Sequence, residues 1–176
     1  TKGFFDALER AVARGVTVRV LYDQLASARI SGYRNLLATL DRIGAQHRAM
    51  LPLQPWRGIY QRPDLRNHRK LLIVDSLIAY TGSQNIIEPG YRNPRHHRRG
   101  LHWLDVMMRA EGPLADGLEA LFVSDWYQET GELLNTPSPD KVTRVGPDKT
   151  WAQVVPSGPA FEGENNLRLF NSLVYG

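Results

Sequence analysis

The sequence predicts an α/β fold, because short apolar strands alternate with amphipathic helices along most of the chain. With 176 residues, the chain is long enough for one domain with its own core. Hydrophobic residues make up 42% of it and charged residues 23%, as in an ordinary globular domain. No apolar run reaches the roughly 18 residues that suggest a membrane-spanning helix. We therefore expect helices packed on a mixed sheet.

The first part of the chain predicts helix, strand, helix and strand, in that order. Residues 3–14 and 32–44 each carry apolar side chains at helical spacing. The apolar stripe of the second helix consists of Leu36, Leu37, Leu40 and Ile43. Strands are expected over residues 16–22 and 46–51. An irregular connection follows, marked by Pro52, Pro55 and Pro63.

Two short apolar runs in the middle of the chain predict a β-hairpin. They cover residues 71–74 and 77–80, and Asp75 and Ser76 would form the turn between them. In such a hairpin the numbers of paired residues sum to about 151. Ser83 would then lie opposite position 68.

The last part of the chain predicts a strand, a helix, a linker and the start of a further strand and helix. The linker is rich in Pro, Thr, Asp and Gly. A strand and a helix beyond it are too little for a separate domain, so we expect them to open a second one. The expected segments are 101–109, 113–128, 129–150, 151–155 and 164–175.

The candidate chemistry lies in the pattern H-x-K-x4-D, formed by His68, Lys70 and Asp75. Residues two apart on a strand point to the same face, so His68 and Lys70 can converge on one small anion. A strand advances about 3.3 Å per residue, which sets Asp75 about 20 Å from His68. We therefore expect Asp75 to serve the turn, where it can accept backbone N–H groups.

The returning strand of the hairpin adds neutral hydrogen-bonding groups to this pair. Ser83 and Asn85 would come back toward the imidazole of His68, and Gly82 would leave room for a ligand near the backbone. This set of groups suits a phosphodiester. The imidazole could attack phosphorus while Lys70 and Asn85 stabilise the charge on the non-bridging oxygens.

A cluster of basic residues indicates a second region that could meet phosphate. It suits anionic lipid headgroups or nucleic acid, and the alternative is a solvated basic loop. The formal net charge of the chain is only +4, so this charge is concentrated locally. The cluster consists of Arg92, Arg95, His96, His97, Arg98 and Arg99.

The hairpin and its surroundings resemble the HKD motif of the phospholipase D superfamily, and in particular bacterial cardiolipin synthases. The resemblance implies a phospholipase D-like α-β-α sandwich around a mixed sheet, here truncated at both ends. The first such domain would cover residues 1–135 without its first strand, with a linker over 136–150 and the start of a second domain over 151–176. The stretches that carry the resemblance are 15–23, 67–70, 80–85, 103–106, 111–113, Phe122 with Asp125-Trp126, and 155–159.

The resemblance also implies roles for single residues. His68 would be the nucleophile that forms a phosphatidyl-histidine intermediate, and Lys70, Ser83 and Asn85 would bind the substrate phosphate. Asp105 would be the carboxylate that orients His68. Members of this family need no metal or other cofactor. The reaction that the resemblance implies would be a phosphatidyl transfer between two phosphatidylglycerol molecules, at the bacterial cytoplasmic membrane.

The chain departs from the family pattern in one respect, because it has no second H-x-K-x4-D. In the family a second HKD domain of the same protein supplies the histidine that protonates the leaving alcohol. We therefore expect this chain to be half of a site and inactive alone. The alternatives are another superfamily phosphodiesterase (a phospholipase D, a phosphatidylserine synthase or a nuclease) and a non-catalytic lipid-binding half-domain. Nucleic acid is the less favoured partner.

Simpler roles remain open for several of these residues. Ser83 could cap the local backbone without touching a ligand, and Asp105 could pair with an arginine. Arg66 and Arg69 flank the motif and could touch phosphate, but both are expected to be solvated charges. Trp103 and Trp126 are expected in the core rather than in a ligand site.

Overall fold

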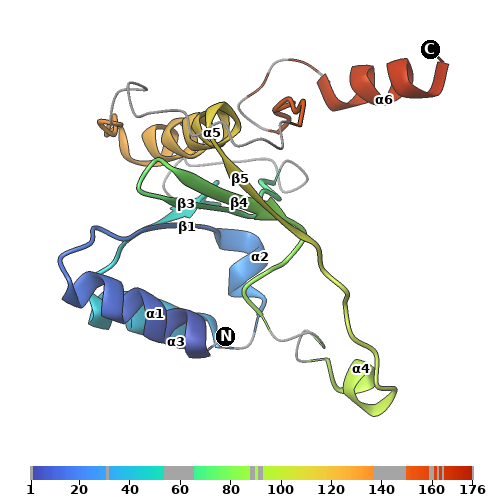
Figure 1. Ribbon diagram of the computed structural model, residues 1–176. Coiled ribbons are helices and arrows are strands. Elements are labelled where there is room, and N and C mark those ends of the chain that lie inside the picture. Colours follow the sequence, from blue (N-terminus) through green and yellow to red (C-terminus); the bar gives the residue numbers. More distant parts are fainter. Residues whose placement is uncertain are drawn as a thin grey trace. The chain divides into compact units, whose positions relative to one another are not determined.

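The computed structural model describes residues 2–30, 32–53, 66–87, 90, 93–136, 150–158, 161, 163 and 165–175. It has the expected α/β character, with parallel and antiparallel strand pairs (Figure 1). The chain divides into two compact units. The first unit comprises Thr1–Asp64 and Gln84–Asp105, and the second comprises Leu65–Ser83 and Val106–Gly176.

The first unit is built on a parallel pair of strands. Strand β1 (Arg19–Asp23) pairs with β2 (Gln46–Met50), in the register Arg19 to Gln46. The described helices of this unit are α1 (Lys2–Ala13), α2 (Gln24–Ala28), α3 (Tyr33–Ile43) and α4 (Pro94–Arg98).

The core of the first unit confirms the predicted apolar stripe of α3. Leu40 is fully buried and Ile43 nearly so. Partly buried side chains from α1, β1 and the residue before β1 pack against them: Phe5, Leu8, Val20 and Val18. Strand β1 begins three residues later than predicted, because the end of α1 uses that stretch. The Val16 N–H donates to the Ala11 carbonyl at 3.1 Å, which closes the helix before the strand can start.

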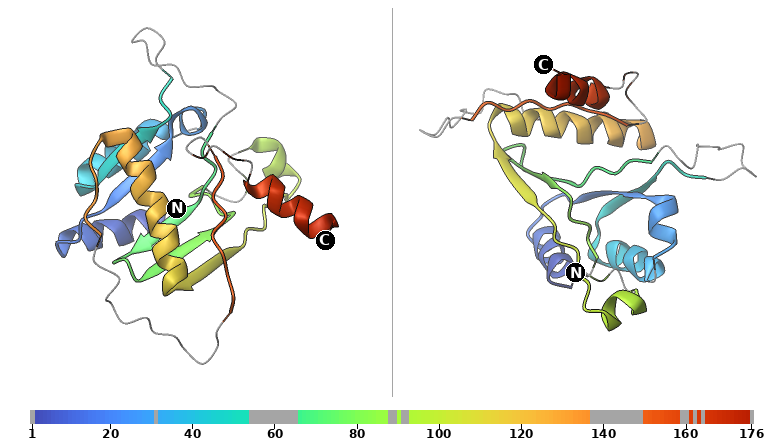
Figure 2. Two further views of the ribbon diagram at one scale, coloured as in Figure 1. Left: turned by 90° about the horizontal axis from the view of Figure 1, so that it is seen from above. Right: turned by 90° about the vertical axis from the view of Figure 1, so that its right-hand side faces the viewer.

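The second unit is a three-stranded antiparallel sheet with one helix on its face (Figure 2). The strands are β3 (Leu71–Val74), β4 (Ile78–Gly82) and β5 (Met107–Glu111), in that order. Helix α5 (Pro113–Thr130) covers them, and α6 (Asn165–Tyr175) follows further along the chain. The core between sheet and helix contains Ala79, Ala110, Ala115 and Leu118. Its small side chains let the helix lie close to the strands.

The hairpin forms as predicted, but its register differs by one residue. Asp75 and Ser76 both have positive φ, at 52° and 56°, as a tight hairpin turn requires. The Leu77 N–H donates to the Val74 carbonyl, and Val74 pairs with Ile78, so the loop holds three residues. Continued past the last paired residues, this register sets Ser83 across from Arg69. The prediction that Ser83 lies opposite His68 is therefore wrong.

Two predicted strands also differ from the structure. The strand expected over 101–109 forms only as β5, from Met107. Residues 151–155 form no strand, and Val154 instead packs against the core cluster and lies next to Gly117 of α5. Helix α5 runs two residues beyond its predicted end, to Thr130, and is capped by Gly131 with a left-handed φ of 71°. Most of the predicted linker, residues 137–149, lies outside the described residues, as do Pro55 and Pro63.

Gly82, at the end of β4, lies against the backbone of the neighbouring strand. A Cβ at this position would be 2.0 Å from the Val106 carbonyl oxygen and 2.9 Å from Met107 Cα. Strand β5 thus fills the space that the sequence suggested for a ligand. That interpretation of Gly82 is wrong, because the residue serves strand packing.

We predict that Gly82→Ala destabilises the chain by about 1–3 kcal/mol, since β4 and β5 must move apart to admit the methyl group. The matched control is Gly3→Ala in α1, where nothing lies within 4 Å of the added Cβ. That control should be neutral or stabilising by up to about 1 kcal/mol. Urea unfolding of both variants measures the difference, and equal effects would contradict the packing role.

Candidate functional site

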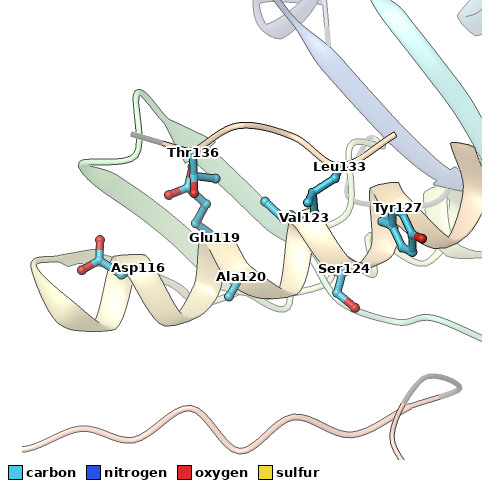
Figure 3. A pocket seen from close by; sticks show the side chains of 8 residues that line it. All are labelled: Asp116, Glu119, Ala120, Val123, Ser124, Tyr127, Leu133 and Thr136. Atoms are coloured by element: carbon cyan, nitrogen blue, oxygen red, sulfur yellow. The ribbon is translucent and has the colours of Figure 1, made fainter. Parts of the chain in front are cut away.

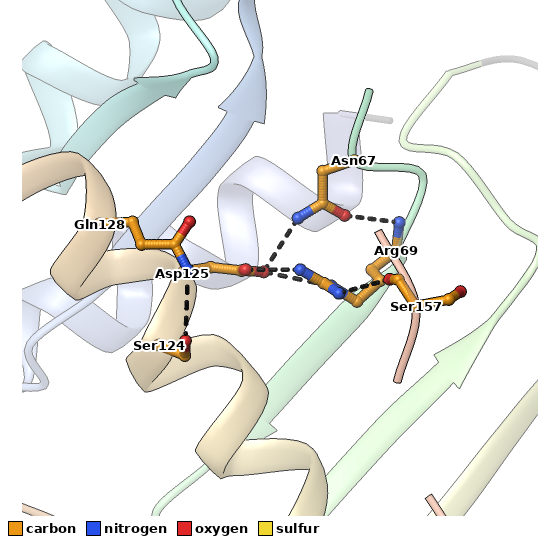
Figure 4. Close-up of polar contacts among 6 residues, drawn as sticks. All are labelled: Asn67, Arg69, Ser124, Asp125, Gln128 and Ser157. Atoms are coloured by element: carbon orange, nitrogen blue, oxygen red, sulfur yellow. Dashed lines mark hydrogen bonds and ion pairs between the residues drawn. The ribbon is translucent and has the colours of Figure 1, made fainter. Parts of the chain in front are cut away.

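The stretch before β3, residues 66–70, separates its side chains onto two sides. Asn67 and Arg69 both hydrogen-bond to Asp125 of α5 (Figure 4). His68 and Lys70 alternate with them along the chain, and His68 is exposed. In an extended chain successive side chains point to opposite faces. The contacts of Asn67 and Arg69 with Asp125 agree with such an alternation, whereas the convergence of His68 and Lys70 on one anion stays a prediction.

The contact between Arg69 and Asp125 is a buried, two-pronged ion pair. Arg69 Nε lies 3.2 Å from Asp125 Oδ2, and Arg69 Nη2 lies 2.5 Å from Oδ1. The side chains are only 18% and 8% exposed. The prediction of a solvated Arg69 is wrong, because a buried carboxylate needs a charged partner and the planar guanidinium fits it bidentately.

Asn67 completes the shell of the buried carboxylate. Its Nδ2 donates to Asp125 Oδ2 at 2.9 Å, and its Oδ1 accepts from the Arg69 backbone N–H at 3.0 Å. The two residues that flank His68 are thus joined to each other and to α5. This arrangement fixes the backbone on both sides of the histidine.

Lys70 lies close to the backbone of the candidate nucleophile. Its Nζ donates to the His68 carbonyl at 2.7 Å, and its side chain is half-buried. An ammonium group has three N–H donors, so one bond to a carbonyl leaves two for phosphate oxygens. The position suits a cation that stabilises charge beside His68.

Ser83 and Asp75 both serve the hairpin in the structure. The Ser83 N–H donates to the Val106 carbonyl at 2.9 Å, and Ser83 Oγ accepts from the Val106 N–H at 3.0 Å. These bonds join the end of β4 to the start of β5. Asp75 lies in the turn, where the sequence places it. The role of Ser83 toward phosphate stays a prediction.

Asn85 and Asp105 belong to the first unit, whereas His68 belongs to the second. The expected contact of Asp105 with His68, and that of Asn85 with a phosphate on His68, therefore stay predictions. Of the two tryptophans expected in the core, Trp126 is buried at 2% exposure, which confirms the expectation. Trp103 is 60% exposed, so the prediction that it lies in the core is wrong.

The basic cluster forms a short helix, α4, in the first unit. The Asn93 side chain accepts from the Arg95 N–H at 2.9 Å and caps the helix. The ring of His96 bonds to the Gly90 carbonyl at 3.2 Å, whereas Arg98 is exposed. Arg92 lies outside the described residues. The other described members of the cluster, Arg95, His97 and Arg99, are exposed as well, and a contact of the cluster with phosphate stays a prediction.

The first unit also holds a group of titratable side chains around His47. Its Nε2 lies 2.9 Å from Asp41 Oδ1, and its ring centroid lies 6.0 Å from that of Tyr22. Burial raises the pKa of Tyr22 to about 12, with a further contribution from the hydrogen bond to Tyr33. Tyr22 is thus neutral at physiological pH, and the group packs α3 against the sheet.

A groove of about 410 Å³ runs along α5 in the second unit (Figure 3). Its lining includes Asp116, Glu119, Val123 and Tyr127 of the helix, together with Leu133 beyond it. None of these residues belongs to the motif. Glu119 also accepts a hydrogen bond from Ser76 at the hairpin turn, at 2.6 Å.

Sequence comparison supplies the family. The model of the cardiolipin synthase, PLD-like domain matches residues 1–126, which include the whole motif. The chain belongs to this family. Within the described part of the chain, no helix is both long and apolar enough to cross a membrane.

Among the proteins that the chain is similar to are cardiolipin synthases of bacteria. The chain is 35% identical over 164 residues to cardiolipin synthase A of Proteus mirabilis (strain HI4320), which covers 90% of this chain and 32% of that protein. It is 34% identical over 174 residues to cardiolipin synthase A of Yersinia pestis bv. Antiqua (strain Angola), covering 97% of this chain and 35% of the relative. The chain thus spans about a third of the length of these relatives. No solved structure matches it.

We predict that Asp125→Ala destabilises the chain by about 3–5 kcal/mol, because Arg69 would be left buried without its counter-charge. Asp116→Ala, at an exposed position of the same helix, is the matched control and should change stability by less than about 0.5 kcal/mol. Thermal and urea unfolding measure both. Equal effects of the two variants would show that the ion pair is not what holds α5 to the motif.

Proposed function

We propose that the protein carrying this chain is a phosphatidyltransferase that makes cardiolipin and glycerol from two phosphatidylglycerol molecules. The observation that supports it most is that Asp125 of α5 binds the residues on either side of His68. Asn67 and Arg69 hold the stretch before β3 on Asp125, and His68 and Lys70 alternate with them along the sequence, in a chain of the cardiolipin synthase family. The bound group would be phosphate, which this pair of side chains suits.

The first step of the proposed reaction is attack by the His68 imidazole on the phosphorus of one phosphatidylglycerol. A nitrogen–phosphorus bond forms, and the bond from phosphorus to the headgroup glycerol oxygen breaks. Lys70 stabilises the charge on the non-bridging oxygens, as Ser83 and Asn85 would also do. The leaving oxygen takes a proton from a general acid and departs as glycerol.

The second step reverses the first with a different alcohol. The glycerol hydroxyl of another phosphatidylglycerol attacks the phosphatidyl-histidine, loses its proton to the same general acid–base group, and releases His68. We assign that group to the histidine of a second HKD domain in the same protein. Asp105 would orient His68 during both steps, and no metal or cofactor takes part.

The proposed substrate also indicates where in the cell the reaction takes place. Phosphatidylglycerol is an anionic membrane lipid, so we propose that the protein works at the bacterial cytoplasmic membrane. The relatives are bacterial proteins named cardiolipin synthase A, which supports this assignment. Because the chain has one H-x-K-x4-D motif, we expect the 176 residues alone to make no cardiolipin.

The test compares the complete open reading frame with the same protein carrying His68→Ala. Incubated with phosphatidylglycerol vesicles, the unaltered protein should release glycerol and form cardiolipin, and the variant should lose at least about 10³-fold in rate, since the nucleophile is gone. His102→Ala, an exposed histidine outside the motif, is the matched control and should retain full activity. Mass spectrometry of the lipids gives the readout.

Three outcomes would contradict the proposal. Cleavage of DNA without cardiolipin would indicate a nuclease of the same superfamily. Release of phosphatidic acid and glycerol would indicate hydrolysis by water. Binding of the lipid with no turnover, in a protein that has both motifs, would indicate a non-catalytic domain.

A further inference from the structure

We propose that Arg69 is a positioning residue that couples residues 156–158 and Phe161 to the stretch before β3 that bears His68 and Lys70. This inference rests on the proposed function for its catalytic consequence, and on the contacts of the second unit for the coupling itself. All residues involved belong to that unit.

The guanidinium of Arg69 contacts two segments that lie far from it in sequence. Two of its nitrogens bind Asp125, and the third, Nη1, donates to the Ser157 carbonyl at 2.9 Å (Figure 4). Its Cζ also lies 5.6 Å from the centroid of the Phe161 ring, within the range of a cation–π contact. One side chain of the motif therefore joins α5 and the segment around Ser157.

The segment around Ser157 is itself shaped for this contact. Gly158 has a φ of +126°, which L side chains rarely adopt, and a Cβ there would lie 3.5 Å from Arg69 Nη1. The Phe161 N–H donates to the Gly158 carbonyl at 3.0 Å. The Ser157 carbonyl and the Phe161 ring thus both contact the same guanidinium.

The coupling extends to α6. Asn165, at the start of that helix, donates from Nδ2 to the Pro156 carbonyl at 3.3 Å. The Pro156 carbonyl therefore binds the start of α6, and the next carbonyl, of Ser157, binds Arg69. A displacement of α6 or of the turn reaches the guanidinium directly.

On the other side, the same guanidinium controls the backbone of the motif. The Arg69 N–H is held by Asn67 Oδ1, and Asn67 shares Asp125 with the guanidinium. His68 lies between these two anchored residues, and Lys70 bonds to the His68 carbonyl. A shift of Arg69 must therefore shift the imidazole and the ammonium together. Arg69 thereby sets the position of the reactive pair relative to the segment beyond residue 150.

The coupling is tested by amide hydrogen exchange on the chain, with one substitution at Arg69 and another at Gly158. Arg69→Lys keeps the charge but loses the fork that reaches both Asp125 and Ser157. We expect it to raise the exchange rate of the Phe161 amide by about fivefold or more. Gly158→Ala, made at the turn, should raise the exchange rate of the Arg69 amide in the same way, because coupling is reciprocal.

Matched controls separate coupling from general loosening. Gly131→Ala also forces a side chain into positive φ, at +71°, but nothing lies within 4 Å of its Cβ. Arg34→Lys changes an exposed arginine of α3. Neither should alter the Arg69 or Phe161 amides. If Arg69→Lys and Gly158→Ala each change amide exchange only in their own segment, the coupling is overturned. If Arg69→Lys does not fold, the exchange rate of the Arg69 amide in Gly158→Ala tests the coupling alone.

The positioning role is tested by kinetics in the complete protein. Arg69→Lys and Gly158→Ala should each lower kcat about tenfold or more at nearly constant KM for phosphatidylglycerol. Misplacement of the reacting groups costs rate rather than binding. Rates are expressed per folded protein, measured by circular dichroism. Changed exchange with an unchanged kcat would overturn the positioning role. If the unaltered protein makes no cardiolipin, the proposed function fails, whereas the exchange result still decides the coupling.

Discussion

The second unit depends on one buried charge. Asp125 is 6% exposed on the face of α5 that packs toward the motif, and a carboxylate there is stable only with a counter-charge and filled hydrogen bonds. Arg69 supplies the charge and Asn67 a further donor. Arg69 and Asn67 are two residues apart, with His68 between them. The contacts that supply Asp125 with its counter-charge and hydrogen bonds therefore also constrain the backbone around His68.

The rest of the second unit supports this arrangement. The alanines between sheet and α5 let the helix approach closely enough for Asp125 to reach the strand before β3. Gly82 lets β5 lie directly against β4, and Ser83 closes that junction with two hydrogen bonds to Val106. These contacts make the hairpin a support for the stretch that precedes it.

The sequence predicted the elements well wherever local spacing decides the structure. The apolar stripe of α3 gave Leu40 and Ile43 correctly as core residues, and the two apolar runs gave the hairpin. The hairpin register was missed by one residue, because Asp75-Ser76 is a weak turn signal that does not fix the loop length. Residues 151–155 have the composition of a strand, but strand formation needs a neighbour, and no described strand pairs with them.

The main feature of the site was missed for a related reason. Arg69 and Asp125 are 56 positions apart, and no local pattern joins them. A signal was present nevertheless, since Asp125 lies two helical turns beyond Leu118, on the apolar face of α5. A charge at such a position needs a partner, and an arginine beside the motif was the natural candidate. The roles of Asn85 and Asp105 depend on contacts between segments, which spacing along the chain does not determine.

The measurement that tests this account most directly is chemical footprinting of the native chain, read residue by residue by mass spectrometry. Diethyl pyrocarbonate and an amine-reactive acylating reagent should modify His68 and Lys70, whereas phenylglyoxal should spare Arg69 until the chain is unfolded and should modify exposed Arg98 throughout. This result would show that the motif divides into an anchored side and a reactive side. Modification of native Arg69 as fast as Arg98, or protection of His68, would contradict it.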